Sequence, residues 1–209
     1  AQHMLAAYPR LDAFEQRLSL ALYRELARGV PVTLQALADR VEASTGDVAR
    51  RLENWPAVRR DELQRIIGYW GLTIMPTRHR MRVGGRDLYA WCAWDTLFLP
   101  ALLGVRVEVH SNCRATGAPV RLTVGPEALE APVPADLALS FVLPDAGAMR
   151  RDVVASFCSH VHFFRSAQLA TECNDLSPSA FTLSLDDAFE AGRLRNSGRY
   201  RSFAVSRRI

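Results

Sequence analysis

The sequence predicts an α+β fold, in which an N-terminal three-helix, winged-helix-like part packs on a C-terminal part of mostly antiparallel strands with short helices. Apolar residues recur at helical spacing through about residue 55, and alternation of apolar and polar residues dominates from residue 86 onward. The chain has 209 residues, of which 49% are hydrophobic, so it is long enough to bury a substantial core. Residues 1–3, ahead of Met4, are interpreted as the remnant of an expression tag.

Three helices are expected before residue 56. The first follows the periodic apolar side chains of residues 14–26. Thr33 is expected to cap the second, over residues 34–41, and Ser44 to cap the third, which Pro56 ends. Three helices in this order, followed by strands, form the pattern of a winged helix-turn-helix. The strands are expected over residues 66–73 and 81–91, the latter around a turn at Gly84 and Gly85.

The rest of the chain is predicted to be strands with two helices. A short apolar helix is expected over residues 94–103, and a last helix capped by Ser184 is expected to run to about Arg195. The best boundary lies near residues 76–85, which predicts an N-terminal domain over 4–80 and a catalytic domain over 81–209, packed as one unit. Further strands are expected at 105–111, 120–124, 137–143 and 157–164.

The positive charge is weak evidence for a nucleic-acid partner. All 26 basic residues are arginine, and the chain also has 22 acidic residues, so the excess of positive charge is small. Neither half of the chain is a basic module. A rival hypothesis is a winged-helix DNA-binding regulator, possibly a metal sensor. Its recognition helix would carry two arginines and two acids, whereas phosphate contact favours a basic face. These residues are Arg50, Arg51, Asp47 and Glu53.

A soluble cytoplasmic protein with no membrane partner is expected. No secretory signal is visible, and the most apolar stretch, residues 89–105, is interrupted by Asp95 and falls short of the ~20 apolar residues that a membrane span needs. Four cysteines are too few for the disulfide framework of a small secreted domain. We therefore interpret them as reduced thiols.

Cys92 and Asp95 are three residues apart at the start of the apolar helix. The helix dipole and free N–H groups at that end favour a thiolate, so we expect the pKa of Cys92 to be lowered. The alternative is a buried cysteine beside a helix-capping aspartate.

Cys158, His160 and His162 alternate in a predicted strand, so they are expected on one face. One hypothesis is a zinc site made of these three residues and Cys92, since zinc accepts mixed sulfur and nitrogen ligands. The alternative is a pair of core histidines that donate to backbone carbonyls.

The remaining candidates are interpreted as structural. Cys113 is expected to be a small buried hydrophobic residue at a strand end, and Cys173 a loop thiol. His110 alternates with apolar strand residues and is also expected to be structural.

Three segments resemble the bacterial organomercurial (alkylmercury) lyase family. They are residues 86–97 (RDLYAWCAWDTL), 111–120 (SNCRATGAPV) and 156–164 (SFCSHVHFF), and their order and separations fit as well. The residues after 165 resemble the family least. Two positions depart from it: Ser159 stands where a second cysteine is frequent, and Trp94 where an aliphatic residue is usual.

The resemblance implies that Cys92 and Cys158 bind mercury while Asp95 moves the proton that releases R–H from R–Hg⁺. An aspartate with an ordinary pKa near 4 is protonated in roughly one molecule in a thousand at neutral pH, so Asp95 must first collect a proton. A metal-bound cysteine is its expected source. The resemblance also implies that Cys113 is structural and that the winged-helix-like part has no DNA role.

The partners follow from this chemistry. The substrate is a small organomercurial, no organic cofactor is expected, and Hg(II) stays bound as product until low-molecular-weight thiols or a mercuric reductase remove it. A monomer is favoured, without nucleic-acid or membrane partners. A lyase-like protein that binds metal without turnover is the remaining alternative.

Overall fold

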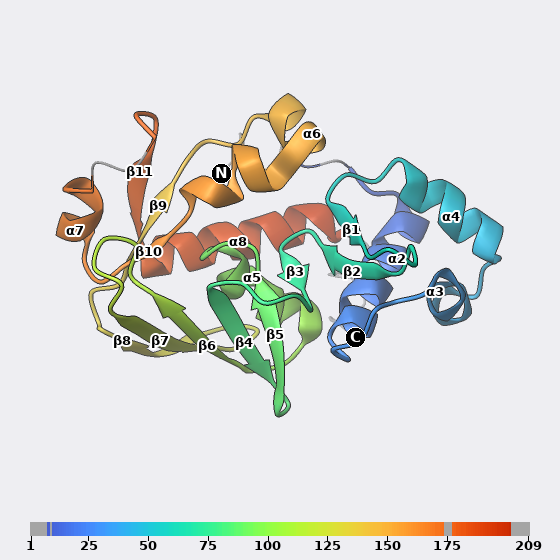
Figure 1. The fold of residues 1–209 in the computed structure, drawn as a ribbon, viewed down its shortest axis with the longest axis horizontal. Coiled ribbons are helices and arrows are strands. Elements are labelled where there is room, and N and C mark those ends of the chain that lie inside the picture. The colour runs from blue at the N-terminus through green and yellow to red at the C-terminus, as the bar shows by residue number, and fades with distance from the viewer. Residues whose placement is uncertain (1–7, 9, 174–176, 202–209) are drawn as a thin grey trace.

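The computed structural model describes residues 8, 10–173 and 177–201. Within them an eight-stranded antiparallel sheet and a three-stranded antiparallel sheet are arranged around helices (Figure 1). The predicted α+β class is confirmed. No helix in the described ranges has the length and apolar character needed to cross a bilayer.

The three N-terminal helices form as predicted, because each starts at a side-chain cap. They are α2 (Ala13–Leu26), α3 (Leu34–Val41) and α4 (Thr45–Glu53). Asp12 and Glu15 make a capping box at α2, and Thr33 and Ser44 cap the next two helices. The three helices gather at one end of the molecule, drawn in blue in Figure 1. Their apolar faces are buried there, with Leu18, Leu22 and Val48 fully enclosed.

The large sheet differs from the prediction at its N-terminal edge. Strand β1, which the sequence analysis missed, pairs with β2, and the single strand expected over residues 66–73 is two strands, β2 and β3. The chain turns between them at Trp70 and Gly71, which both have positive φ. The strands are β1 (Val58–Arg60), β2 (Ile66–Tyr69), β3 (Leu72–Thr73), β4 (His79–Val83), β5 (Arg86–Ala90), β6 (Val107–Asn112), β7 (Pro119–Val124) and β8 (Leu129–Val133), in the order β1-β2-β3-β5-β4-β6-β7-β8.

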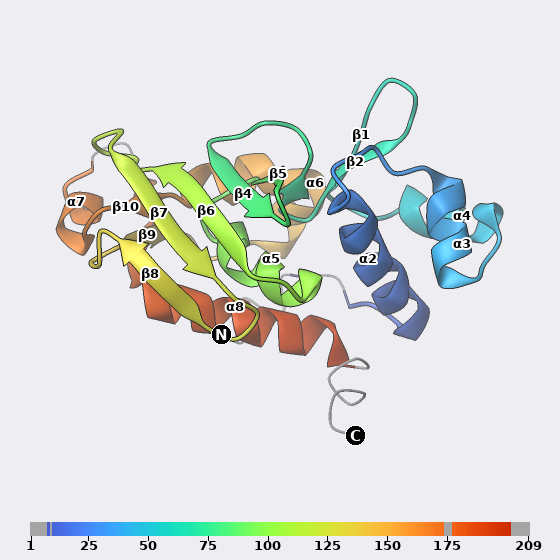
Figure 2. The same ribbon diagram turned by 90° about the horizontal axis from the view of Figure 1, so that it is seen from below.

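Two helices cross the centre of the molecule. Helix α5 (Asp95–Leu103) lies between the large sheet and α8 (Leu185–Arg199), which runs along the molecule (Figure 2). The two helices approach closely at Gly192, where a Cβ would lie 2.9 Å from the Cβ of Phe98. Ser184 caps α8 as predicted, and the helix continues past its expected end.

The region around Cys158 is not the strand that alternation predicted. Cys158–His160 forms a 3-10 helix, η1, and only the last two residues of the expected segment are a strand, β10 (Phe163–Phe164). The small sheet has the order β10-β9-β11, with β9 (Ala138–Phe141) and β11 (Phe181–Ser184). The flanking helices are α6 (Ala146–Ser156) and α7 (Ala167–Thr171).

A buried polar network joins the N-terminal helices to α8. The Ser19 hydroxyl lies 3.0 Å from the Tyr69 hydroxyl and 2.8 Å from that of Tyr200. The Tyr23 hydroxyl donates to the carbonyl of Trp70 at 2.9 Å. These contacts tie the β2–β3 turn to α2 and to Tyr200 at the end of α8.

Candidate active site

Three side chains that lie far apart in the sequence converge in the interior. Cys92 lies in the loop between β5 and α5, Asp95 is the first residue of α5, and Cys158 begins η1. Their sulfur and carboxylate ligand atoms all lie within 4.8 Å of one another. All three residues are buried, with exposed fractions of 0%, 5% and 5%. The structure thus brings together the three predicted site residues.

Backbone hydrogen bonds hold the loop that carries Cys92. The Trp91 N–H donates to the Gly71 carbonyl at 2.9 Å, and the Ala93 N–H donates to the Val161 carbonyl at 3.3 Å. The first bond ties the loop to the β2–β3 turn, and the second ties it to the segment after η1. The Cys92 loop is therefore held between the β2–β3 turn and the segment that follows Cys158.

Asp95 is oriented by its own loop rather than used as a helix cap. The Cys92 N–H donates to Asp95 Oδ2 at 2.8 Å, whereas the N-cap residue of α5 is Trp94, whose side chain makes no capping bond. The alternative of a capping aspartate is therefore wrong.

Gly71 leaves space for the Asp95 carboxylate. The sequence analysis did not identify this role of Gly71. Its φ is +97°, and a Cβ there would lie 2.4 Å from Asp95 Oδ1 and 2.6 Å from Cγ. A side chain at this position would occupy the space of the carboxylate. A lone glycine inside an apolar strand pattern was the available signal, because such a glycine often marks a close backbone approach.

Both thiols are held in their protonated form, contrary to the expectation for Cys92. Burial raises the pKa of Cys92 well above its ordinary value, and the neighbouring Cys158 and Asp95 add to the rise. The hydrogen bond with Cys92 lowers the pKa of Cys158, but burial and the carboxylates of Asp95 and Asp152 outweigh it, so that this pKa is also raised. The helix dipole does not lower the pKa of Cys92 as predicted, because α5 begins three residues after Cys92 and burial of the thiol outweighs the effect of the helix end.

Asp95 is poised between its two protonation states. Burial raises its pKa from 3.8 to about 6, while the hydrogen bonds with Cys92 and the charge of Arg195 limit the rise. At pH 7 about one Asp95 in ten is then protonated, rather than one in a thousand. The side chain can therefore both accept and return a proton near neutral pH.

Aromatic rings pack around Trp94, the residue that precedes Asp95. Trp94 contacts Phe98, Phe141 and Phe157 edge-on, with ring centroids 5.1–5.8 Å apart. The indole N–H donates to the Ala188 carbonyl in α8 at 2.8 Å. Trp94 is thus fixed against α8. Ser159, the other departure from the family pattern, is exposed and donates to the Ala155 carbonyl.

The zinc hypothesis fails on geometry. Cys158, His160 and His162 do not share a strand face because Cys158–His160 is a 3-10 helix. Among the described residues, neither histidine belongs to the cluster of potential ligands that contains Cys92 and Cys158.

The other candidates lie outside the cluster. Cys113 is buried beside the turn after β6, where its N–H donates to the Ala118 carbonyl. Burial acts to raise the pKa of its thiol, but hydrogen bonds with Thr116 and backbone groups outweigh it and lower the pKa. His110 is half-buried in β6, and Cys173 is half-buried after α7.

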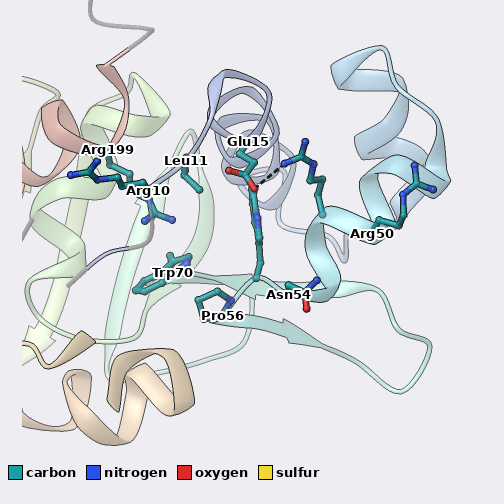
Figure 3. Close-up of a pocket in the computed structure, with 10 residues that line it drawn as sticks. Arg10, Leu11, Glu15, Arg50, Asn54, Pro56, Trp70 and Arg199 are labelled. Atoms are coloured by element: carbon teal, nitrogen blue, oxygen red, sulfur yellow. Dashed lines mark hydrogen bonds and ion pairs between the residues drawn. The ribbon is translucent and has the colours of Figure 1, made fainter. Parts of the chain in front are cut away.

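A hollow of about 320 Å³ opens beside Trp70 and contains none of the three site residues. Glu15, labelled in Figure 3, lines the hollow and forms an ion pair with Arg51, another of its lining residues. The lining of this hollow holds no thiol, so it is not part of the candidate site. It is lined by Arg10, Leu11, Glu15, Arg50, Arg51, Asn54, Trp55, Pro56, Trp70 and Arg199.

Comparisons with known proteins agree with the geometry. The alkylmercury lyase family model matches residues 72–195. The chain belongs to the alkylmercury lyase family. This alkylmercury lyase is 42% identical over 172 residues to an alkylmercury lyase of Staphylococcus epidermidis, covering 82% of this chain and 78% of the relative. It is 42% identical over 177 residues to one of Pseudomonas putida, covering 85% and 82%.

A solved structure supports the same assignment. The mercury-bound form of MerB2 matches this alkylmercury lyase with a TM-score of 0.72 and 27% identity, covering 94% of this chain and 96% of that one. The resemblance drawn from the three sequence segments is confirmed, and so is the prediction of an enzyme.

Proposed function

We propose that this alkylmercury lyase cleaves the carbon–mercury bond of R–Hg⁺ by protonolysis, with Cys92 and Cys158 as mercury ligands and Asp95 as the proton shuttle. One observation supports this most strongly: two thiols and a carboxylate lie within 4.8 Å of one another in a buried site. Thiolates are the preferred ligands of soft metal ions, so two converging cysteines suit mercury better than oxygen or nitrogen donors would.

The first step is exchange at mercury. One cysteine displaces the ligand X from R–Hg–X, forming a mercury–sulfur bond, and its proton leaves with X as HX. The second cysteine then binds the same mercury, which makes its thiol acidic. Asp95 accepts this second proton, for which it is suited because its carboxylate is mostly ionised at neutral pH and already bonded to the Cys92 loop.

The second step breaks the carbon–mercury bond. Two thiolates donate electron density to mercury, and Asp95 returns its proton to the carbon, which keeps the bonding electron pair. R–H departs, and Hg(II) stays on the two sulfurs. A carboxyl whose pKa lies near the working pH is the most effective donor in such a transfer, because both of its states are populated.

Release of Hg(II) needs an external acceptor. We infer that low-molecular-weight thiols, or a mercuric reductase, take the metal from the two cysteines by ligand exchange in the cytoplasm, and that no organic cofactor takes part. We also propose that the chain acts as a monomer, without nucleic-acid or membrane partners, and that residues 4–80 form a packing domain for the catalytic domain, residues 81–209. The Gly71 turn against Asp95 supports that role.

Incubation with phenylmercury and excess thiol tests the proposal, with benzene measured by gas chromatography. The wild type should release benzene repeatedly. Cys92→Ser and Cys158→Ser should each release none or nearly none, because a serine hydroxyl is a hard donor with a pKa too high to supply an anion. Cys173→Ser, outside the site, is the matched control and should keep full activity.

Two results would contradict the proposal. Full turnover by Cys158→Ser would show that one thiol suffices. Tight binding of phenylmercury by the wild type with no benzene under any thiol concentration would show a metal-binding protein without turnover.

A further inference from the structure

The outer face of the large sheet carries one row of basic side chains without an acid. In β4, β6 and β7 outward residues alternate with buried ones, so that Arg80, His110 and Arg121 lie on the face away from the core. The register places Arg80 opposite His110 and His110 opposite Arg121, across three neighbouring strands (Figure 2). Tyr89 and Val133 occupy the two ends of the same row. The row therefore holds two arginines and an imidazole, and no carboxylate.

The next row on the same face is balanced in charge. Arg82 of β4 lies opposite Asp87 of β5 on one side and opposite Glu108 of β6 on the other. Opposite charges in such cross-strand pairs stabilise a sheet, whereas basic groups that face one another destabilise it. One row of this face thus follows the usual pairing rule, and its neighbour departs from it.

The arginines of the unbalanced row are poorly neutralised by the protein. Arg121 is exposed and makes no ion pair in the described part of the chain, and the same holds for Arg78, just before β4. Arg80 has one contact with a carboxylate, at 3.5 Å from Asp87, and both side chains are partly exposed. Such a pair contributes little, because water screens it. The protein itself therefore leaves much of this positive charge without a counter-charge.

A separate hollow of about 310 Å³, here called the outer-face hollow, lies against the unbalanced row. Its volume is near the lower end of the range for small-molecule sites. Two polar side chains of its wall are fixed: the Ser111 hydroxyl lies 2.8 Å from Nδ1 of buried His79, and the Thr77 hydroxyl donates to the Ala90 carbonyl at 2.6 Å. The described residues that line it are Thr77, Arg78, Arg80, His110, Ser111, Asn112, Pro119, Val120 and Arg121. Three of them are arginines, and none is an acid.

A doubly charged oxyanion is the ligand that this arrangement fits. A guanidinium presents its N–H groups in a planar fork that matches the oxygens of a phosphate or a carboxylate. Arg80 and Arg121 stand on either side of β6, so their backbones are about 10 Å apart and their long side chains can reach one group above His110. A phosphoryl group carries close to two negative charges at neutral pH and has three oxygens that accept hydrogen bonds. It can therefore neutralise both arginines at once.

We propose that the outer-face hollow is a binding site for a phosphoryl group, either inorganic phosphate or the phosphate monoester of a small molecule. Arg80 and Arg121 hold its oxygens, with His110 between them. The site is separate from the cluster of two thiols and a carboxylate, whose residues do not line it. The inference is independent of the proposed lyase function. Because the anion relieves the repulsion within the row, its binding stabilises the folded chain.

A ¹H–¹⁵N NMR titration of the full chain measures the binding. Inorganic phosphate and phenyl phosphate are added separately, at an ionic strength held constant with sodium chloride, and the backbone amides of residues 77–80, 110–112 and 120–121 are followed. The wild type should bind phosphoryl groups in a saturable manner, with the shift changes concentrated at these residues. The probe that binds more tightly identifies the source of the group, and either order supports the proposal.

Two exposed arginines on the same face provide a test variant and its matched control. Arg121→Gln removes a cation from the unbalanced row and should weaken phosphate binding at least about tenfold, the effect of losing a hydrogen bond to a charged group. Arg82→Gln removes the same charge from the balanced row and should leave the affinity within about twofold of the wild type, because that arginine already has acidic neighbours. Circular dichroism establishes that both variants are folded.

Thermal unfolding at constant ionic strength gives a second readout. Phosphate should raise the Tm of the wild type and of Arg82→Gln more than that of Arg121→Gln. Absence of saturable binding by the wild type would overturn the proposal. So would an equal loss of affinity in the two variants, which indicates general attraction to a basic surface, or binding of acetate as tight as that of phosphate.

Discussion

Replacing Gly71 by alanine tests whether the β2–β3 turn sets the position of the Asp95 carboxylate. The new Cβ would lie 2.4 Å from Asp95 Oδ1, and ordinary van der Waals contact begins near 3.4 Å, so the carboxylate must move by about 1 Å. A displacement of that size at a reacting group costs about a hundredfold in rate. We therefore expect Gly71→Ala to lower benzene release from phenylmercury about a hundredfold, equivalent to about 2.7 kcal/mol in the activation barrier.

The substitution also strains the backbone, so a matched control is needed. Gly85 has φ +81°, close to the +97° of Gly71, but a Cβ at Gly85 would meet nothing within 4 Å. Gly85→Ala should carry only the cost of a left-handed alanine, about 1–2 kcal/mol of stability, and keep wild-type turnover per folded molecule. Folded fractions are measured by circular dichroism. Equal turnover per folded molecule in the two variants would refute the role assigned to Gly71.

Three further outcomes are expected. Asp95 has a pKa of about 6 in the folded protein against 3.8 in the unfolded chain, so its ionisation lowers the free energy of unfolding as the pH rises from 3.8 through 6. Asp95→Asn removes this charge and should raise the free energy of unfolding by on the order of 3 kcal/mol at pH 8, with no change below pH 3.8. Urea denaturation at pH 8 and below pH 3.8 measures the difference. Cys113→Ser should lower the free energy of unfolding by at most about 1 kcal/mol, because Thr116 and the backbone groups that bond the Cys113 thiol can also bond a hydroxyl, and it should keep benzene release per folded molecule; a folded but inactive variant would contradict this. The isolated segment 4–80 should show no sequence-specific DNA binding in a gel-shift assay, because Arg51 on α4 is paired with Asp12 and Glu15 of the α2 capping box.

Local signals in the sequence predicted the helices well. Ser44 and Ser184 accept hydrogen bonds from backbone N–H groups three residues on, and such bonds depend only on neighbouring residues. The bounds 34–41 of the second helix are those observed. Strands β1 and β8 were missed because their stability comes from pairing with β2 and β7, which no local pattern reveals.

Alternation misled the prediction at Cys158. The segment from Phe157 to Phe164 alternates as a strand would, yet its first half is a 3-10 helix that follows directly on α6. Burial does not alternate along this segment, since Phe157 and Cys158 are both buried and so are Phe163 and Phe164, so the period-two pattern of the sequence does not report a pleated strand. Among the described residues, neither histidine therefore joins Cys158 in a cluster of potential ligands.

The resemblance identified the candidate site residues, but the sequence did not predict the direction of their pKa shifts. The pKa of Cys92 is raised rather than lowered, because burial dominates over a helix end that begins only at Asp95. Arg195 gave no signal at all, since arginines on a helix are normally exposed and only the packing of α8 on α5 reveals a buried one. Charge environments of this kind depend on tertiary contacts.

The central claim is that Asp95 delivers the proton after the two thiols have bound mercury. A single-turnover experiment tests it directly: phenylmercury is mixed with excess protein at pH 7 without added thiol, and benzene is followed over time. The wild type should release about one benzene per phenylmercury, whereas Asp95→Asn should hold phenylmercury on its two cysteines and release almost none, because an amide cannot shuttle a proton. Benzene release by Asp95→Asn at the wild-type rate would contradict the account.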